Sequence, residues 1–170
     1  MKTCNKTLDA LLKNVGRVEG VKGVNFNAKD GAIFRDSYIH QLKTPLFSKY
    51  IFPESKEEEI NVVLEETILN SVSACKEVES KNIEVSAYYG SKGILFDLKD
   101  EGPGFNYKST LARRSAMKLP QREKILARNL KNGGHGLYAL MSFADKFRYS
   151  DKGNRLYFVF NLQKLKNKKD

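Results

Sequence analysis

The chain carries the sequence ILFDLKDEGPGF at positions 94–105. Its first part alternates apolar residues at Ile94, Phe96 and Leu98, which is typical of a strand that packs one face on a core. The strand then ends on Asp100 and runs into a Gly-Pro-Gly turn. A carboxylate at this point is a fixed hydrogen-bond acceptor, and the glycines leave the backbone open to close approach by a ligand. The stretch therefore predicts a binding site at the edge of a sheet.

Further alternating segments flank this stretch and predict hairpins. Residues 83–89 connect to it through the turn Gly90–Gly93, and residues 146–162 form a second hairpin around Asp151–Asn154. Near the N-terminus, residues 21–26 and 32–34 are expected to form a third hairpin. The sequence therefore predicts a sheet made largely of neighbouring antiparallel strands.

Three segments, at 8–15, 60–75 and 137–144, have apolar residues at helical spacing. In the second segment, Glu66 and Asn70 are four residues apart and lie on one side of the helix, at the border of the apolar stripe. A carboxylate and a carboxamide at this border can line a cleft. The same pair also fits an ordinary solvated helix face.

The third helix is preceded by the glycine-rich segment Asn132–Gly136. Glycines that run into a helix N-terminus expose unpaired N–H groups at the positive end of the helix dipole, which favours a phosphate. His135 at this point could hydrogen-bond a phosphate or be exposed. The cluster taken alone is also compatible with a simple tight turn.

Between the two glycine clusters lies a long basic segment, residues 106–131. It contains eight Lys or Arg against one Glu, so 8 − 1 = +7 of the formal charge lies here. A helix is expected to begin near Pro120. Such a segment fits a mobile lid over an anion, a contact for a protein or nucleic acid, or a surface loop.

Length and composition fit one globular domain of 170 residues. The formal charge is 30 − 20 = +10, which favours an acidic partner. Cys4 and Cys75 are the only cysteines, and without an export signal they are expected to be reduced in a cytoplasmic protein. No apolar run approaches the ~20 residues of a membrane-spanning helix, so no membrane association is expected. With two histidines and two cysteines scattered along the chain, a zinc site is not expected.

Three segments taken together resemble the nucleotide-binding boxes of the GHKL ATPases, a superfamily that includes DNA gyrase and the histidine kinases. They are Glu66–Asn70, Asp100–Phe105 and Gly133–Leu137, in this order. Their form is most similar to the bacterial anti-sigma-factor serine/threonine kinases. The resemblance covers about residues 53–162.

The resemblance implies an α+β fold, namely a two-layer α/β sandwich of the Bergerat type. Its sheet would be mixed but mostly antiparallel, with helices on one face. The ATPase domain would span residues 53–163. It would follow an N-terminal extension, residues 1–52, packed on the domain, and precede a basic tail at 164–170.

The resemblance also implies ATP and Mg²⁺ as ligands. Asn70 would ligate the Mg²⁺, and Glu66 would act as general base or orient the attacking group. Asp100 would accept a hydrogen bond from the adenine amino group. The other cofactor-binding residues implied are Gly102, Gly104, Gly134, His135, Gly136 and Leu137. The chain departs from the family pattern at Ala74 and His135, where many members carry His and Arg.

Three functions remain open. The first is a kinase that phosphorylates a serine or threonine of an antagonist protein and sequesters a sigma factor or similar regulator, possibly as a homodimer. A histidine kinase-type catalytic domain acting on a partner is a variant of it. The second is a nucleotide-gated binding module without phosphotransfer. The third, a nucleic-acid-binding domain, is the least expected because the basic segment lacks interleaved aromatic residues.

Overall fold

The structure is a computed structural model that describes residues 2–28, 37, 40–42, 54–75, 82–115 and 136–162. The elements in chain order are α1 (Lys2–Val15), β1 (Val18–Asn27), α3 (Glu54–Ala74), β2 (Asn82–Gly90), β3 (Gly93–Asp100), α4 (Tyr107–Ser115), α6 (Gly136–Phe143), β4 (Lys146–Tyr149) and β5 (Arg155–Asn161).

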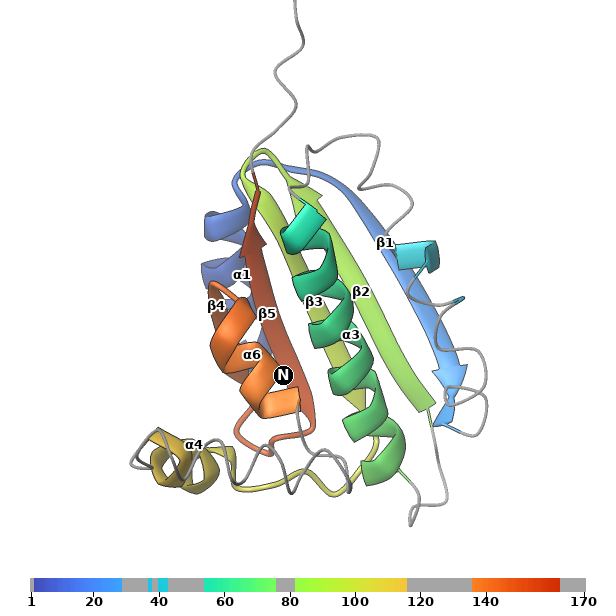
Figure 1. Ribbon diagram of the computed structural model, residues 1–170, viewed down its shortest axis with the longest axis vertical. Coiled ribbons are helices and arrows are strands. Elements are labelled where there is room, and N and C mark those ends of the chain that lie inside the picture. Colours follow the sequence, from blue (N-terminus) through green and yellow to red (C-terminus); the bar gives the residue numbers. More distant parts are fainter. Residues whose placement is uncertain are drawn as a thin grey trace, which may run out of the picture.

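The strands that the structure describes form one five-stranded sheet in the order β1-β2-β3-β5-β4, and each pair of neighbours is antiparallel (Figure 1). The hairpins β2–β3 and β4–β5 are those that the alternating apolar residues predict. β1 pairs with β2 along its length, from Val18 opposite Gly90 to Asn27 opposite Asn82. The second arm of the expected N-terminal hairpin, at 32–34, lies outside the described residues.

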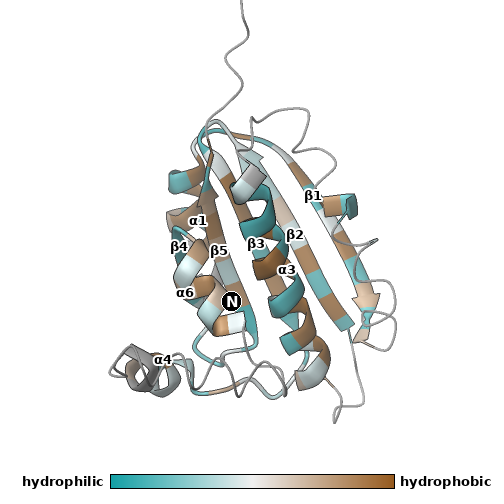
Figure 2. Cartoon of the chain, in the orientation of Figure 1, coloured by the Kyte–Doolittle hydropathy of each residue, from teal (hydrophilic) through white to brown (hydrophobic). Residues whose placement is uncertain are grey.

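The main core lies between the sheet and the layer formed by α3 and α6 (Figure 1). Apolar and polar residues alternate along β2, as the sequence pattern requires for a strand with one buried face (Figure 2). Phe96 of β3 stacks on Phe158 of β5 at 5.1 Å between ring centroids, and Ile68 of α3 is fully buried in the same cluster. Each such side chain stabilises the fold by about 1.5–3 kcal/mol. This packing fixes α3 lengthwise on the sheet, with its C-terminal part beside the end of β3 (Figure 1).

A second, smaller core lies on the opposite face of the sheet. Leu95, Tyr157 and Val159 point to this face and are covered by α1, whose Val15 is fully buried among them. Lys146 of β4 also donates a hydrogen bond to Asn14 Oδ1 of α1. α1 therefore seals this face of the sheet at β3 and β5.

The predicted α+β class and two-layer sandwich are confirmed, with two differences of detail. The helices were expected on one face only, whereas α1 packs on the other. The sheet was expected to be mixed, whereas every pairing among the described strands is antiparallel.

The three amphipathic segments form α1, α3 and α6 as predicted. The expected helix near Pro120 lies outside the described residues, and of the expected basic lid the structure describes residues 106–115, which include α4. None of the helices that the structure describes is long and apolar enough to cross a membrane.

Candidate functional site

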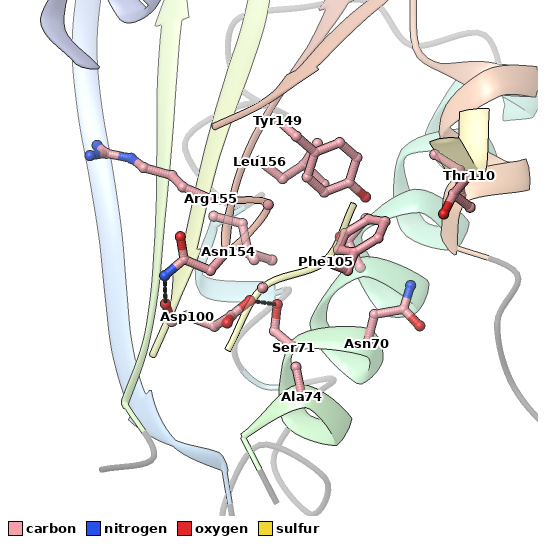
Figure 3. Close-up of a pocket in the computed structure, with 15 residues that line it drawn as sticks. Asn70, Ser71, Ala74, Asp100, Phe105, Thr110, Tyr149, Asn154, Arg155 and Leu156 are labelled. Carbon is pink, nitrogen blue, oxygen red and sulfur yellow. Dashed lines mark hydrogen bonds between the residues drawn. The ribbon is translucent and has the colours of Figure 1, made fainter. Parts of the chain in front are cut away.

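A cavity of about 280 Å³ opens between α3, the end of β3 and the turn between β4 and β5. Figure 3 shows its lining residues as sticks. The side chains that make its walls are largely apolar, among them Leu98, Leu137 and Leu156, while Asp100 supplies a carboxylate. A concave, mostly apolar site with a few polar groups is the usual form of a small-molecule site, although this one is at the small end of the range.

Asp100 is the last residue of β3 and is buried, with 7% of the residue exposed. One oxygen, Oδ2, accepts a hydrogen bond from the Ser71 hydroxyl at 3.0 Å. The other, Oδ1, accepts from the Gly102 N–H at 2.9 Å. Each carboxylate oxygen can accept a second bond, so Asp100 is held in place and can still accept from a ligand.

Burial raises the pKa of the Asp100 carboxyl above its ordinary value, because it disfavours the charged form. The hydrogen bonds from Ser71 and Gly102 and the positive charge of Lys152 act in the opposite direction, and burial is the largest effect. The Cys75 thiol lies next to this site, at the end of α3, and burial likewise raises its pKa. Cys75 is therefore a packing residue here rather than an ionised thiol.

Asn70 points away from Asp100, into the part of the cavity that Thr110 of α4 also lines (Figure 3). Its side-chain amide faces the first residue of α6, because a Cβ added at Gly136 would collide with it. The same added atom would lie 3.2 Å from the main-chain oxygen of Glu66. The absence of a side chain at Gly136 thus creates the space that the Asn70 amide occupies beside the start of α6.

The structure brings together most of the described site residues that the sequence predicts. Asn70, Asp100, Gly104 and Leu137 line the cavity. Gly102 contacts the Asp100 carboxylate, and Gly136 contacts Asn70. Glu66 lies one helical turn from Asn70 and is half-buried, but it is not among the lining residues. Gly134 and His135 lie outside the described residues.

An aromatic cluster closes one side of the cavity. The Phe105 ring meets the Tyr149 ring edge to face at 5.1 Å, and Tyr107 stacks on Tyr149 at 5.4 Å. Phe105 and Tyr149 both line the cavity, and Phe105 is 42% exposed. Aromatic faces at a cavity wall suit a flat, apolar ligand ring.

Several lining residues were not predicted from the sequence, and two of these, Ser71 and Asn154, bond to Asp100 through their side chains. Ser71 follows Asn70 directly and lies four residues after Thr67 on the buried side of α3; a hydroxyl at a core position is the signal that could have found it. Asn154 was assigned only to a turn, yet its side-chain Nδ2 donates to the Asp100 carbonyl at 3.1 Å. No local pattern connects residues 100 and 154, because their contact arises only when β3 and β5 pair.

The metal-ligating side chains of the described residues do not gather into a ready-made metal site. Among the described residues, no group of three or more His, Cys, Asp or Glu side chains could hold a metal ion. Asn70 offers one hard oxygen ligand. This donor set fits an ion such as Mg²⁺, which keeps several waters and is commonly held by few protein ligands together with substrate phosphates.

Comparison with known proteins assigns the family. A family model described as "Histidine kinase-like ATPase domain" matches residues 40–160, which is most of the chain. A search of curated proteins finds no match. The match spans α3, the strands β2 to β5 and α6, and so includes every described residue that lines the cavity. The chain belongs to the histidine kinase-like ATPase domain family.

Proposed function

We propose that this chain is an ATP-binding regulatory protein of the anti-sigma-factor type, which transfers phosphate from Mg-ATP to a serine or threonine of an antagonist protein. The observation that carries the proposal is the buried Asp100 carboxylate in an otherwise largely apolar cavity. ATP is the expected ligand because the family is one of ATPase domains.

The cavity has the chemistry that an adenine ring requires. The ring is flat and apolar on its faces, which suits contact with Leu137, Leu156 and Phe105. Its amino group is a donor, and Asp100 offers a carboxylate with remaining acceptor capacity. A buried charged acceptor that lost its partner would be costly, so the site would favour adenine over a base without the amino group.

The triphosphate would then extend from Asp100 toward Asn70 and the start of α6. The first main-chain N–H groups of a helix have no partner within the helix and favour anions. When bound with the nucleotide, Mg²⁺ would neutralise phosphate charge, and the Asn70 amide oxygen is the side-chain ligand proposed for it. Gly134 and His135 remain proposed phosphate contacts on the strength of the sequence resemblance alone.

Phosphotransfer is assigned to Glu66. Its carboxylate would accept the proton of the attacking hydroxyl as the new bond forms between that oxygen and the γ-phosphorus. The bond from the γ-phosphorus to the bridging oxygen breaks, and ADP leaves. The form of the Asp100–Phe105 box and the small size of the domain support the anti-sigma-factor type, with a sigma factor or its antagonist as the regulatory partner.

ATP binding is tested first, by calorimetry with Mg-ATP on the wild-type chain and on Asp100→Asn. The wild type should bind, and the variant should bind roughly ten- to a hundredfold more weakly, as expected for losing a hydrogen bond to a charged group. Thermal unfolding without nucleotide serves as the control for folding. Absence of ATP binding by the folded wild type would refute the proposal.

Phosphotransfer is tested separately, with γ-labelled ATP and a candidate antagonist protein. Acid-stable label on the antagonist, lost in Glu66→Gln, would support the serine/threonine kinase; acid-labile label would indicate histidine phosphorylation instead.

The second candidate function is a nucleotide-gated binding module without transfer. It is favoured by the position of Glu66 outside the lining of the cavity. It predicts ATP-dependent partner binding that Glu66→Gln leaves unchanged, with no label transferred.

A further inference from the structure

Two turns that are far apart in sequence pack directly on each other beside the cavity. We name residues 100–105 the recognition loop and residues 151–154, between β4 and β5, the hairpin turn. The recognition loop carries Asp100. The hairpin turn carries no residue that the sequence resemblance assigns to nucleotide binding, although its Gly153 and Asn154 line the cavity.

Asn154 makes two hydrogen bonds with the main chain of Asp100, one as acceptor and one as donor. The Asp100 N–H donates to the Asn154 carbonyl at 3.0 Å, and the Asn154 side-chain Nδ2 donates to the Asp100 carbonyl at 3.1 Å. In a regular antiparallel pair the second bond comes from a main-chain N–H. Here the side-chain amide supplies it at the point where β5 begins (Figure 3). Through these two bonds, Asn154 extends the hydrogen-bond ladder between β3 and β5 to include Asp100.

Reciprocal glycine contacts hold the two turns together. Gly104 has a φ of +76°, and a Cβ added there would collide with the main-chain carbonyl of Lys152. Gly153 has a φ of +79°, and a Cβ added there would collide with the main-chain oxygen of Phe105. The backbones therefore touch at two points, and a shift of the hairpin turn must move the recognition loop.

The hairpin turn is itself anchored at the next residue. Arg155 forms a bidentate ion pair with Asp97 of β3, with Nε at 2.8 Å from Oδ1 and Nη2 at 2.6 Å from Oδ2. Asp97 is only 5% exposed, and a bidentate pair fixes orientation as well as distance. The register of β5 against β3 is thereby fixed immediately beside Asn154.

We infer that Asn154 is a positioning residue for base recognition: through its paired bonds to the main chain of Asp100 it sets the direction of the carboxylate that accepts the adenine amino group. The inference rests on the proposed function, because it assumes that Asp100 recognises adenine. Ser71 and Gly102 hold the two carboxylate oxygens, and Asn154 holds the backbone from which that carboxylate extends. Losing the Asn154 amide leaves the Asp100 carbonyl without its side-chain donor, so that only the main-chain bond from the Asp100 N–H still joins the two residues.

The experiment compares ATP with inosine triphosphate, which has a carbonyl oxygen in place of the amino group. Calorimetry would measure both affinities, with Mg²⁺, for the wild type, Asn154→Ala, Asn154→Ser and Asn161→Ala. Asn154→Ser retains a small donor at the position. Asn161 is the matched control, since it is an exposed asparagine at the opposite end of β5. Thermal unfolding and hydrogen exchange of residues 100–105 would be measured for each.

The wild type and Asn161→Ala should prefer ATP to inosine triphosphate by the same ratio. Asn154→Ala should lower that ratio roughly fivefold, which corresponds to one hydrogen bond of about 1 kcal/mol, with Asn154→Ser in between. Exchange within the recognition loop should become faster in Asn154→Ala. A folded Asn154→Ala with the wild-type ratio would overturn this role and leave the proposed function standing. A wild type that binds neither nucleotide would overturn both.

Discussion

Asp100 is the residue on which the site depends, and its environment gives it a measurable pH dependence. Burial raises the pKa of this carboxyl above 3.8, so the folded chain keeps the proton at pH values where the unfolded chain has lost it. The contribution of this group to the free energy of unfolding is therefore present at acid pH and is lost as the pH rises through the folded pKa. The charged, buried form is tolerated because Ser71 and Gly102 bond to it.

Asp100→Asn removes this titration and leaves the shape of the side chain almost unchanged. The free energy of unfolding of the variant, minus that of the wild type, should increase as the pH rises from about 3.8 through the folded pKa and then remain constant. Urea denaturation at a series of pH values measures the difference. A difference that does not change with pH would show that burial does not control the titration of Asp100.

Substitution of Gly136 tests the role of Asn70, because it should affect nucleotide binding without a large effect on the stability of the fold. A Cβ at this position would displace the Asn70 amide, which is the end of a flexible side chain, and would lie 3.2 Å from the main-chain oxygen of Glu66, which needs a shift of only a few tenths of an ångström. Gly136→Ala should therefore change the unfolding temperature little and still weaken Mg-ATP binding by roughly tenfold, equivalent to ~1.4 kcal/mol. Ser142→Ala, at an exposed position of the same helix, is the control. An unchanged affinity for Mg-ATP in Gly136→Ala would remove Asn70 from the site.

Residues with a chemical signature could be identified from the sequence, whereas residues defined by contacts could not. Asp100 stands at the end of an apolar strand before two glycines, and Asn70 lies four residues after a carboxylate on a helix. Ser71 shows only a hydroxyl at a core position of α3, and Asn154 shows no signal beyond its place in a turn. Each acquires its role by bonding to Asp100 from an element that is distant in the chain.

At the scale of elements, the contact between the recognition loop and the hairpin turn makes Gly104 and Gly153 partners. Alanine at either position would adopt a left-handed conformation at a cost of about 1–2 kcal/mol, and its Cβ would also push the opposing backbone away. Each single variant should therefore be destabilised by at least that amount in urea denaturation.

Because both substitutions separate the same two backbones, the double variant should lose less stability than the sum of the single variants, by at least 0.5 kcal/mol. Gly23→Ala on β1 is the control. Gly23 has no positive φ, and an added Cβ would meet its nearest atom at 3.4 Å, so its effect should be small. Strict additivity of Gly104→Ala and Gly153→Ala would mean that the two turns do not act as one unit.

Strand pairings could be predicted from the sequence where the two strands follow each other closely in the chain. β2–β3 and β4–β5 are hairpins whose turns and alternation lie within one stretch of sequence, and both form as expected. The pairing of β1 with β2 joins segments separated by more than fifty residues, including all of α3. Alternation alone does not specify such a partner, so the sequence favoured a local hairpin for 21–26.

At the scale of the whole molecule, residues 2–27 do more than pack against the ATPase elements, because β1 extends the same sheet and α1 covers its second core. The sequence resemblance begins near residue 53 and the family model at residue 40, so neither includes α1 or β1. The amphipathic pattern of α1 correctly predicted a helix with one apolar face. It could not tell which face of the sheet that helix would cover, since β3 and β5 are buried on both faces.

A fragment limited to residues 40–160 should therefore fail to fold stably. It lacks α1, which covers Leu95, Tyr157 and Val159, and β1, which bonds to β2. Exposing three fully buried side chains costs about 5–9 kcal/mol at about 1.5–3 kcal/mol each, which is comparable with the total stability of a domain. Thermal unfolding and binding of a hydrophobic dye would be measured for this fragment, for residues 17–170 and for the full chain. Removal of α1 alone should already lower the unfolding temperature and expose apolar surface, and removal of β1 should lower the temperature further. Equal unfolding temperatures for all three would show that the sheet is complete without its N-terminal elements.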